Sequence, residues 1–247
     1  MISISRSLFA ALGLTVALGA CGSTTDDDRI TVLAAASLTE AFGELADAFG
    51  EANGNEVVFS FAGSSSLAGQ VLGGAPADVI ATADDEAMAR LGETLAADPV
   101  VFATNRAAIV VETGNPLGIT SLTDLADPSM VVVLCGPSAA CGRYAREVLD
   151  LAGVEVTPSS LEETPKAVIT KVALGEADAG IVFASDIVTA PPSVTGIEIA
   201  AAFNIIADYP IAAIADAPNP AGAQAFIDFV ISPAGREILE RNGFGAP

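Results

Sequence analysis

Short runs rich in β-branched residues alternate with runs whose apolar residues recur at helical spacing, from residue 30 to residue 242. This alternation predicts an α/β protein with largely parallel sheets. Strands are expected at 30–34, 56–61, 78–81, 107–112, 130–134 and 180–183, with one long strand or a strand pair at 205–214. Helices are expected at 39–49, 67–72, 86–91, 144–152, 165–174, 222–230 and 233–242.

The composition excludes several kinds of chemistry. The 247 residues include 31 acidic and 10 basic side chains, a formal net charge of −21, and no histidine. Serine–histidine and cysteine–histidine catalysis, histidine-ligated zinc and histidine proton shuttles all need an imidazole. Nucleic-acid binding needs a basic surface, which this chain lacks. The length still allows a sizeable core in one large domain or two small ones.

The N-terminal segment has the features of a secretory signal. Arg6 is followed by an apolar run over 8–20, which is shorter than the roughly 20 residues needed to span a bilayer. The run ends in LGAC, which resembles a lipobox, so we expect a signal peptide over 1–20, a lipid on the Cys21 thiol and a polar linker over 21–28. An ordinary signal peptide with an incidental cysteine is the alternative. No transmembrane helix is expected after it.

Export determines how the two remaining cysteines are interpreted. Cys135 and Cys141 are six residues apart, and in an oxidising compartment such a pair is expected to form a disulfide. The loop-entropy estimate for a ring of about seven residues is roughly 2 kcal/mol, so the main expected effect is to hold one loop in shape. A two-thiol metal site is the alternative, but histidine ligands are absent.

Two of the expected strand-to-helix junctions are rich in serine. They read AAASLTE over 34–40 and FAGSSSL over 61–67. In open α/β sheets, ligands bind beyond the carboxyl ends of strands, where helix starts offer unpaired N–H groups and a partial positive charge. Each junction therefore suits an uncharged cradle for an anion. Local structure is the alternative at both places, as a capping box of Ser37 with Glu40 and as a turn with a cap after Gly63.

Four sequence blocks together resemble the molybdate-binding proteins of ABC importers. They are TVLAAASLT at 31–39, FSFAGSS at 59–65, GAPADV at 74–79 and GIVFASD at 180–186, and the similarity extends over nearly everything after Arg29. The resemblance implies a two-lobed periplasmic-binding-protein fold of type II. Each lobe would be a mixed, mostly parallel sheet flanked by helices, and molybdate or tungstate would lie in the cleft between them. Serine hydroxyls, backbone N–H groups and usually a tyrosine hydroxyl hold the anion in this family.

The resemblance implies three oxyanion contacts by position. Ser37 and Ser64 match the two serines of the family, and the backbone N–H of Cys141 matches a third donor at a helix start. Pro165 stands where the family often donates a backbone N–H, and Phe183 where it often has tyrosine. Two expected donors are therefore missing.

Thr164 and Lys166 are the nearest substitute donors. Thr164 would cap the helix that begins at Pro165, and the Lys166 ammonium would offer a cationic contact to the anion. The alternative for Lys166 is a solvated surface charge. We expect no direct metal ligands, because the metal would enter only as its oxyanion, and no cofactor.

The implied lobes divide at two β crossovers. Lobe one would contain 29–105 and 209–247, and lobe two 106–208, with hinge strands near 106–112 and 203–211. Closure around the anion would select the liganded state for the permease of an ABC importer. The resemblance thus implies a monomeric receptor, not an enzyme, that is lipid-anchored on the outer face of the cell membrane.

Other functions remain open at this point. Sulfate or phosphate could replace molybdate, since cleft size decides among tetrahedral anions. Tyrosine-ligated ferric binding is disfavoured because Tyr144 and Tyr209 are the only tyrosines. A serine hydrolase of the Ser-x-x-Lys type is disfavoured because no serine has a lysine three residues later. A surface lipoprotein without a transport role would show no ligand-dependent stability, and the signal segment disfavours a DNA-binding regulator that shares the fold.

Overall fold

The computed structural model describes residues 29–247. The predicted signal peptide, the lipidation of Cys21 and the linker over 21–28 lie outside these residues. Within them, nine strands form one sheet in the order β2-β1-β3-β9-β4-β7-β5-β6, and β8 also pairs with β4. The strands are β1 (Arg29–Ala35), β2 (Glu56–Ala62), β3 (Val79–Ala81), β4 (Val100–Glu112), β5 (Val132–Cys135), β6 (Ser160–Glu162), β7 (Ala179–Phe183), β8 (Val194–Glu198) and β9 (Ile206–Ala213).

Helices flank this sheet on both faces. They are α1 (Thr39–Asn53), α2 (Ser64–Leu72), α3 (Asp85–Ala89), α4 (Ala140–Ala152), α5 (Pro165–Ala173), α6 (Ala184–Val188), α7 (Pro220–Val230) and α8 (Pro233–Arg241), with short 3-10 turns at Ala36–Leu38, Gly92–Thr94 and Leu122–Ala126. No helix within residues 29–247 has the length and apolar content needed to cross a membrane.

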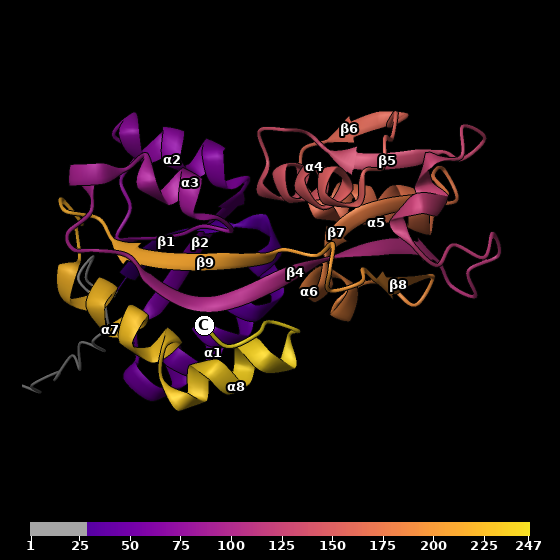
Figure 1. Cartoon of the computed structure of the whole chain (residues 1–247). Coiled ribbons are helices and arrows are strands. Elements are labelled where there is room, and N and C mark those ends of the chain that lie inside the picture. Colours follow the sequence, from indigo (N-terminus) through magenta and orange to yellow (C-terminus); the bar gives the residue numbers. More distant parts are fainter. Residues whose placement is uncertain (1–28) are drawn as a thin grey trace, which may run out of the picture.

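The long strand β4 is shared by two lobes. Its residues 100–106 pair with β9, whereas residues 107–112 pair with β7 and β8. Figure 1 shows one lobe with β1, β2 and β9 between α2 and α3 on one side and α1, α7 and α8 on the other, and a second lobe with β5–β8 and α4–α6. This is the two-lobed periplasmic-binding-protein fold.

Parallel and antiparallel pairing have separate places in the sheet. β1 runs parallel to β2 and β3, and β5 runs parallel to β6 and β7. The antiparallel pairings all involve β4 or β9, the two long strands near the boundary between the lobes. The predicted division between 105 and 106 lies one residue before β4 changes partners, and the second, between 208 and 209, lies within β9. We keep these lobe boundaries as a proposal.

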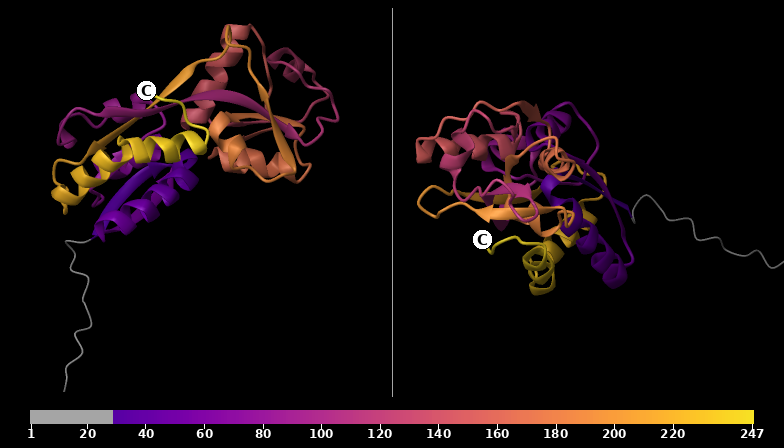
Figure 2. Two further views of the ribbon diagram at one scale, coloured as in Figure 1. Left: turned by 90° about the horizontal axis from the view of Figure 1, so that it is seen from below. Right: turned by 90° about the vertical axis from the view of Figure 1, so that its right-hand side faces the viewer.

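One buried apolar cluster extends through both lobes, and each lobe also has a cluster of its own. In lobe one, Phe42 and Phe49 of α1 pack edge-on against Phe226 of α7, with ring centroids 6.0 and 5.4 Å apart. In lobe two, Val148 and Leu149 of α4 pack among buried residues of β4, β5 and β7. The chain ends on lobe one, where Thr104 of β4 and Gly245 exchange two backbone hydrogen bonds (Figure 2).

Most predicted elements occur, but several bounds differ. The strand predicted at 107–112 begins already at Val100, and the helix predicted at 39–49 continues to Asn53. The segment 205–214 forms one strand, β9, rather than a pair. α2 begins at Ser64 instead of Leu67, and α4 at Ala140 instead of Tyr144. The short β6, β8 and α6 were not predicted. Serine, alanine and cysteine carry no apolar periodicity, so the pattern missed the first turns of both helices.

The predicted disulfide between Cys135 and Cys141 is confirmed, with Cα atoms 5.7 Å apart. It joins the end of β5 to the first turn of α4. Gly142 lies next to it, and a Cβ atom there would come within 2.0 Å of the Gly136 carbonyl oxygen and 2.6 Å of the Cys135 carbonyl oxygen. The chain therefore needs a residue without a side chain at this position for α4 to start against β5.

We expect Gly142→Ala to lower the free energy of unfolding by about 1–3 kcal/mol, the usual cost of overpacking. Gly43→Ala in α1 is the matched control, because its Cβ would meet no atom within 4 Å. Alanine there should stabilise the helix by up to about 1 kcal/mol. Urea unfolding followed by circular dichroism measures both changes, and equal stability of the two variants would contradict the close approach at Gly142.

Candidate functional site

A small cavity of about 20 Å³ lies between the lobes. Its lining is made almost entirely of small residues, which let a ligand approach the backbone closely. Lobe one contributes 35–37, 62–64 and Ala83, and lobe two contributes 139–141, Glu163, Pro165 and Phe183.

Helix starts converge on this cavity from both lobes. The turn Ala36–Leu38 that leads into α1, the start of α2 and the start of α4 all lie in its lining, and none of the three has a side-chain cap. The first N–H groups of a helix have no partner within the helix, and they carry a partial positive charge. Three uncapped helix starts that face one cavity form a site for an anion.

Two serine hydroxyls add side-chain donors to these backbone groups. Ser64 is the first residue of α2 and is 1% exposed, and its Oγ accepts a hydrogen bond of 3.0 Å from the Ala83 N–H. Ser37 is 8% exposed, and its Oγ lies 3.0 Å from the hydroxyl oxygen of Tyr209. Both hydroxyls line the cavity, and each is anchored by a protein partner behind it.

Tyr209 is a residue of this region that the sequence did not predict. It lies in β9 with no exposed surface, and its ring packs edge-on against Phe102, Phe183 and Phe244 at 5.3–6.4 Å. Burial raises the pKa of its hydroxyl well above the usual value. Its contact with Ser37 joins residues 172 positions apart, so no local pattern could have indicated it.

The structure brings five of the singled-out residues together and leaves two apart. Ser37, Ser64, Cys141, Pro165 and Phe183 all line the cavity.

Thr164 and Lys166 are not among the lining residues. Thr164 caps α5, as predicted, with its Oγ1 accepting from the Ala167 N–H at 3.3 Å. The Lys166 ammonium lies 2.5 Å from a Glu40 carboxylate oxygen on the surface between α5 and α1. Contact between Lys166 and an anion in the cavity would require the ammonium to leave Glu40, and this contact stays a prediction.

The cavity contains hydrogen-bond donors rather than metal ligands. Glu163 is its only acidic lining residue and is exposed. Within residues 29–247, no group of three or more histidine, cysteine, aspartate or glutamate side chains could hold a metal ion.

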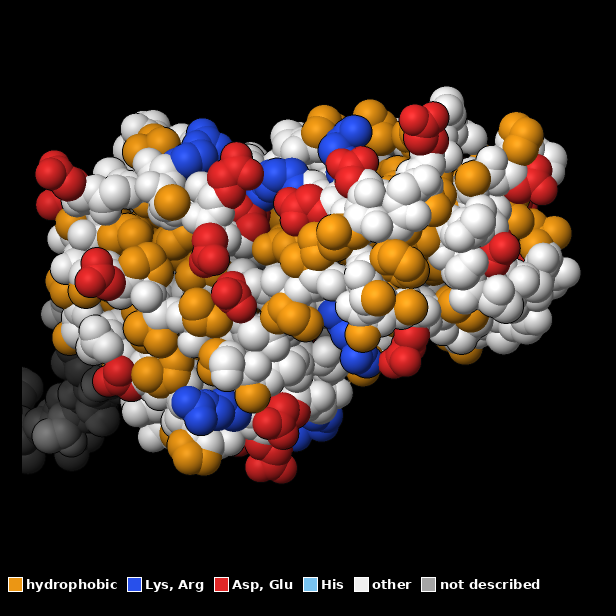
Figure 3. Space-filling view, viewed as in Figure 1, with side chains coloured by type: hydrophobic (Ala, Val, Ile, Leu, Met, Phe, Trp, Pro, Cys, Tyr) orange, Lys and Arg blue, Asp and Glu red, His pale blue; other side chains and the backbone are white. Residues whose placement is uncertain are grey.

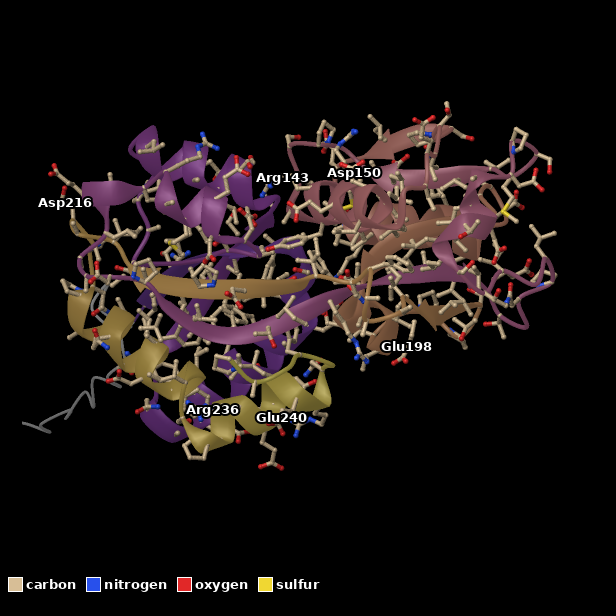
Figure 4. The ribbon with its side chains drawn as sticks, in the orientation of Figure 1. Arg143, Asp150, Glu198, Asp216, Arg236 and Glu240 are labelled. Carbon is tan, nitrogen blue, oxygen red and sulfur yellow. A yellow bond between two sulfur atoms is a disulfide. The ribbon has the colours of Figure 1, made fainter. Side chains whose placement is uncertain are left out.

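Arg143 connects the lobes beside the cavity. It projects from α4 of lobe two, and its guanidinium lies 2.5 Å from Asp84 and 3.2 Å from Glu86, both at the start of α3 in lobe one. The guanidinium also donates to Ser65 of α2 at 3.4 Å. The Arg143 and Asp84 side chains are only 19% and 4% exposed, so solvent screens this pair weakly. Figures 3 and 4 show a basic side chain among acidic ones at the boundary between the lobes.

Asp186 is a buried carboxyl beside the cavity wall. It lies in α6, and burial raises its pKa to about 7, although a hydrogen bond of 3.0 Å from the Phe183 N–H favours the charged form. The charge of Glu40 raises this pKa further, and the charge of Lys166 lowers it. Asp186 therefore holds a proton in the folded protein at a pH where an exposed aspartate is ionised.

Comparisons with known proteins show what the chain as a whole is similar to. The family described as bacterial extracellular solute-binding proteins matches residues 30–245. The molybdate-binding protein ModA of Mycobacterium tuberculosis H37Rv is 39% identical over 259 residues, which cover 100% of this chain and 99% of the relative. ModA of Escherichia coli K12 is 32% identical over 254 residues, 96% of each chain. The solved periplasmic molybdate-binding protein of Azotobacter vinelandii superimposes with a TM-score of 0.73 at 20% identity, covering 88% of this chain and 99% of that one.

We expect Arg143→Gln to favour separation of the lobes, because it removes the ion pairs of Arg143 with Asp84 and Glu86 across the cleft. A loss of about 1–3 kcal/mol of attraction would shift the balance between open and closed forms by about 5–150-fold. Small-angle X-ray scattering of the unliganded protein should then show a larger radius of gyration. Arg241→Gln is the control, since Arg241 pairs with Glu44 within lobe one. An unchanged radius for Arg143→Gln would show that this pair does not hold the lobes together.

We expect the raised pKa of Asp186 to make the protein less stable as pH rises from about 4 to about 7. In this window the folded state keeps a proton that the unfolded chain releases, so the free energy of unfolding falls by up to about 1.4 kcal/mol per pH unit and levels off above the folded pKa. Asp186→Asn removes this contribution and should flatten the slope, whereas Asp228→Asn at an exposed position should keep it. Urea unfolding across the pH range tests this, and identical slopes for Asp186→Asn and the wild type would contradict it.

Proposed function

The chain belongs to the family of bacterial extracellular solute-binding proteins, and from this premise we propose that it captures molybdate in the cleft between its lobes and delivers it to the permease of an ABC importer. The observation that carries the proposal is the convergence of three uncapped helix starts and two serine hydroxyls on one cavity. The names of the relatives at 39% and 32% identity support molybdate as the ligand. The protein acts in this proposal as a receptor rather than as an enzyme.

A dianion can bind here although the chain carries a formal charge of −21. Aligned N–H groups and hydroxyls hold an anion through dipoles, and they need no nearby cation. Surface carboxylates farther away than the Debye length of about 8 Å are largely screened at physiological ionic strength. The nearest ionised pairs, Arg143 with Asp84 and Lys166 with Glu40, are internally compensated.

In this proposal the anion takes hydrogen bonds from the hydroxyls and backbone N–H groups of Ser37 and Ser64 and from the N–H of Cys141. The disulfide holds the loop before Cys141 in place. Thr164 and Lys166 complete the set of proposed contacts, with Lys166 exchanging Glu40 for the anion in the liganded state.

The finer features of the receptor are also proposals. We propose that tungstate binds as molybdate does, since both are tetrahedral dianions. We further propose that a lipid on Cys21 anchors a monomeric receptor to the outer face of the cell membrane and that the linker over 21–28 gives it reach. These features follow from the N-terminal sequence and from the resemblance described above.

We expect molybdate and tungstate to raise the melting temperature more than sulfate or phosphate at equal concentration. A ligand present at 100 times its dissociation constant adds about 2.7 kcal/mol, which corresponds to a shift of several degrees. In calorimetry, Ser64→Ala should weaken molybdate binding about tenfold or more, because it removes a hydrogen bond to a charged group. Lys166→Ala should weaken it severalfold.

Ser66→Ala is the matched control for Ser64→Ala, because Ser66 lies in the same serine run but is exposed. Its affinity for molybdate should equal that of the wild type. If no oxyanion shifts the melting temperature, the receptor proposal is wrong. If sulfate or phosphate gives the largest shift, the site binds an oxyanion but the assignment of molybdate is wrong.

A further inference from the structure

We propose that Asn105 and Tyr209 orient the Ser37 hydroxyl, so that Ser37 only donates a hydrogen bond to the bound anion. Both are positioning residues, since neither lines the cavity. The inference rests on the proposed function and deepens it, because it concerns which anions the site accepts. It follows from the direction of three successive hydrogen bonds behind Ser37.

The backbone determines the orientation of the Asn105 amide. Its Oδ1 accepts from the Arg106 N–H at 2.9 Å and from the Ser185 N–H at 3.5 Å. The Nδ2 group consequently faces the Ser185 Oγ at 2.7 Å and the Tyr209 hydroxyl oxygen at 3.3 Å. An amide NH₂ group can only donate, so Tyr209 is the acceptor in its contact with Asn105.

Tyr209 then has one hydrogen left to donate. Its hydroxyl oxygen has one other hydrogen-bond partner in the described chain, the Ser37 Oγ at 3.0 Å. Burial raises the pKa of this phenol well above its usual value, so the Tyr209 hydroxyl keeps its hydrogen and can donate it. The Tyr209 O–H therefore donates to Ser37.

The Ser37 hydroxyl has one hydrogen to donate, and the contact with Tyr209 leaves that hydrogen available to the ligand. Its Oγ already accepts from Tyr209, and its own hydrogen is left to point into the cavity that it lines. Ser64 is set in the same way by the Ala83 N–H. Both hydroxyls thus present hydrogens to the ligand, and hydrogen bonds in such a chain strengthen one another.

This arrangement has a consequence for specificity. A fully deprotonated oxyanion accepts every hydrogen bond that the two serines and the helix starts offer. Hydrogen phosphate carries a proton that needs an acceptor, and Glu163 is the only carboxylate in the lining that could supply one. The two serine contacts therefore favour molybdate and sulfate over phosphate by the direction of their hydrogen bonds, in addition to any effect of size.

A double-mutant cycle tests the role of Tyr209. Tyr209→Phe keeps the ring that packs against Phe102, Phe183 and Phe244 and removes only the hydroxyl. We expect it to weaken molybdate binding about five- to tenfold in the wild-type background. In the Ser37→Ala background, Tyr209→Phe should change the molybdate affinity less than twofold, because the Ser37 hydroxyl that Tyr209 orients is already absent.

Two further variants sharpen the test. Tyr144→Phe is the matched control, since it removes the other tyrosine hydroxyl and its ring also packs edge-on against Phe183; its affinity should stay unchanged. Asn105→Asp places an acceptor opposite the Tyr209 hydroxyl and so reverses the direction of the hydrogen bonds from residue 105 through Tyr209 to Ser37. It should therefore lower molybdate affinity as Tyr209→Phe does. In competition experiments with phosphate, the ratio of molybdate affinity to phosphate affinity should be smaller in Tyr209→Phe and in Asn105→Asp than in the wild type.

The outcomes separate this inference from the proposed function. One outcome is that the wild type binds molybdate while Tyr209→Phe lowers the molybdate affinity by the same factor with and without the Ser37 hydroxyl. In that case Tyr209 acts through structure alone and the inference is overturned. Full affinity of Tyr209→Phe would overturn it as well. If the wild type binds no oxyanion at all, the proposed function itself is wrong.

Discussion

The unpaired N–H groups at the starts of three helices are the constraint on which the site depends. Three elements begin at one cavity without side-chain caps: the turn that precedes α1, the helix α2 and the helix α4. Their first backbone N–H groups therefore need hydrogen-bond partners from outside the helices. The surrounding sequence serves this arrangement. Alanines and glycines leave the backbone accessible, the disulfide and Gly142 allow α4 to start close against β5, and Ser37 and Ser64 add hydroxyls to the same face. In the proposed function, one anion accepts hydrogen bonds from donors of both lobes at once.

Charge in this protein is arranged around the site rather than in it. The formal charge of −21 belongs mostly to the surface, while the cavity is lined by neutral residues except for the exposed Glu163. Two cations nearby, Arg143 and Lys166, reach from lobe two to carboxylates of lobe one. They hold the two walls of the cleft near each other, and they do so without entering the cavity. The separation of these roles explains how an acidic protein can present a site that attracts a dianion.

Much of the fold was predictable, and about half of the site. Apolar periodicity located nearly every long element, because packing against a sheet requires it. The serine-rich junctions and the matched positions led to Ser37, Ser64 and Cys141, which lie together in the structure. The first turns of α2 and α4 were missed because small residues carry no periodicity. The partnership of Tyr209 with Ser37 and the bridge from Arg143 to Asp84 depend on how distant strands and helices meet, and no local pattern encodes such contacts.

The antiparallel ribbon of β4 and β9 has a mechanical consequence. Its strand β4 crosses from lobe one into lobe two, and we expect the ribbon to be the hinge of the proposed closure. A bound ion close to the hinge changes the separation of the lobes by a small distance there. The same rotation displaces the outer ends of the lobes by a larger distance. Binding of a small ion would thereby change the angle between the outer surfaces of the two lobes. A membrane partner could recognise that angle without touching the ion.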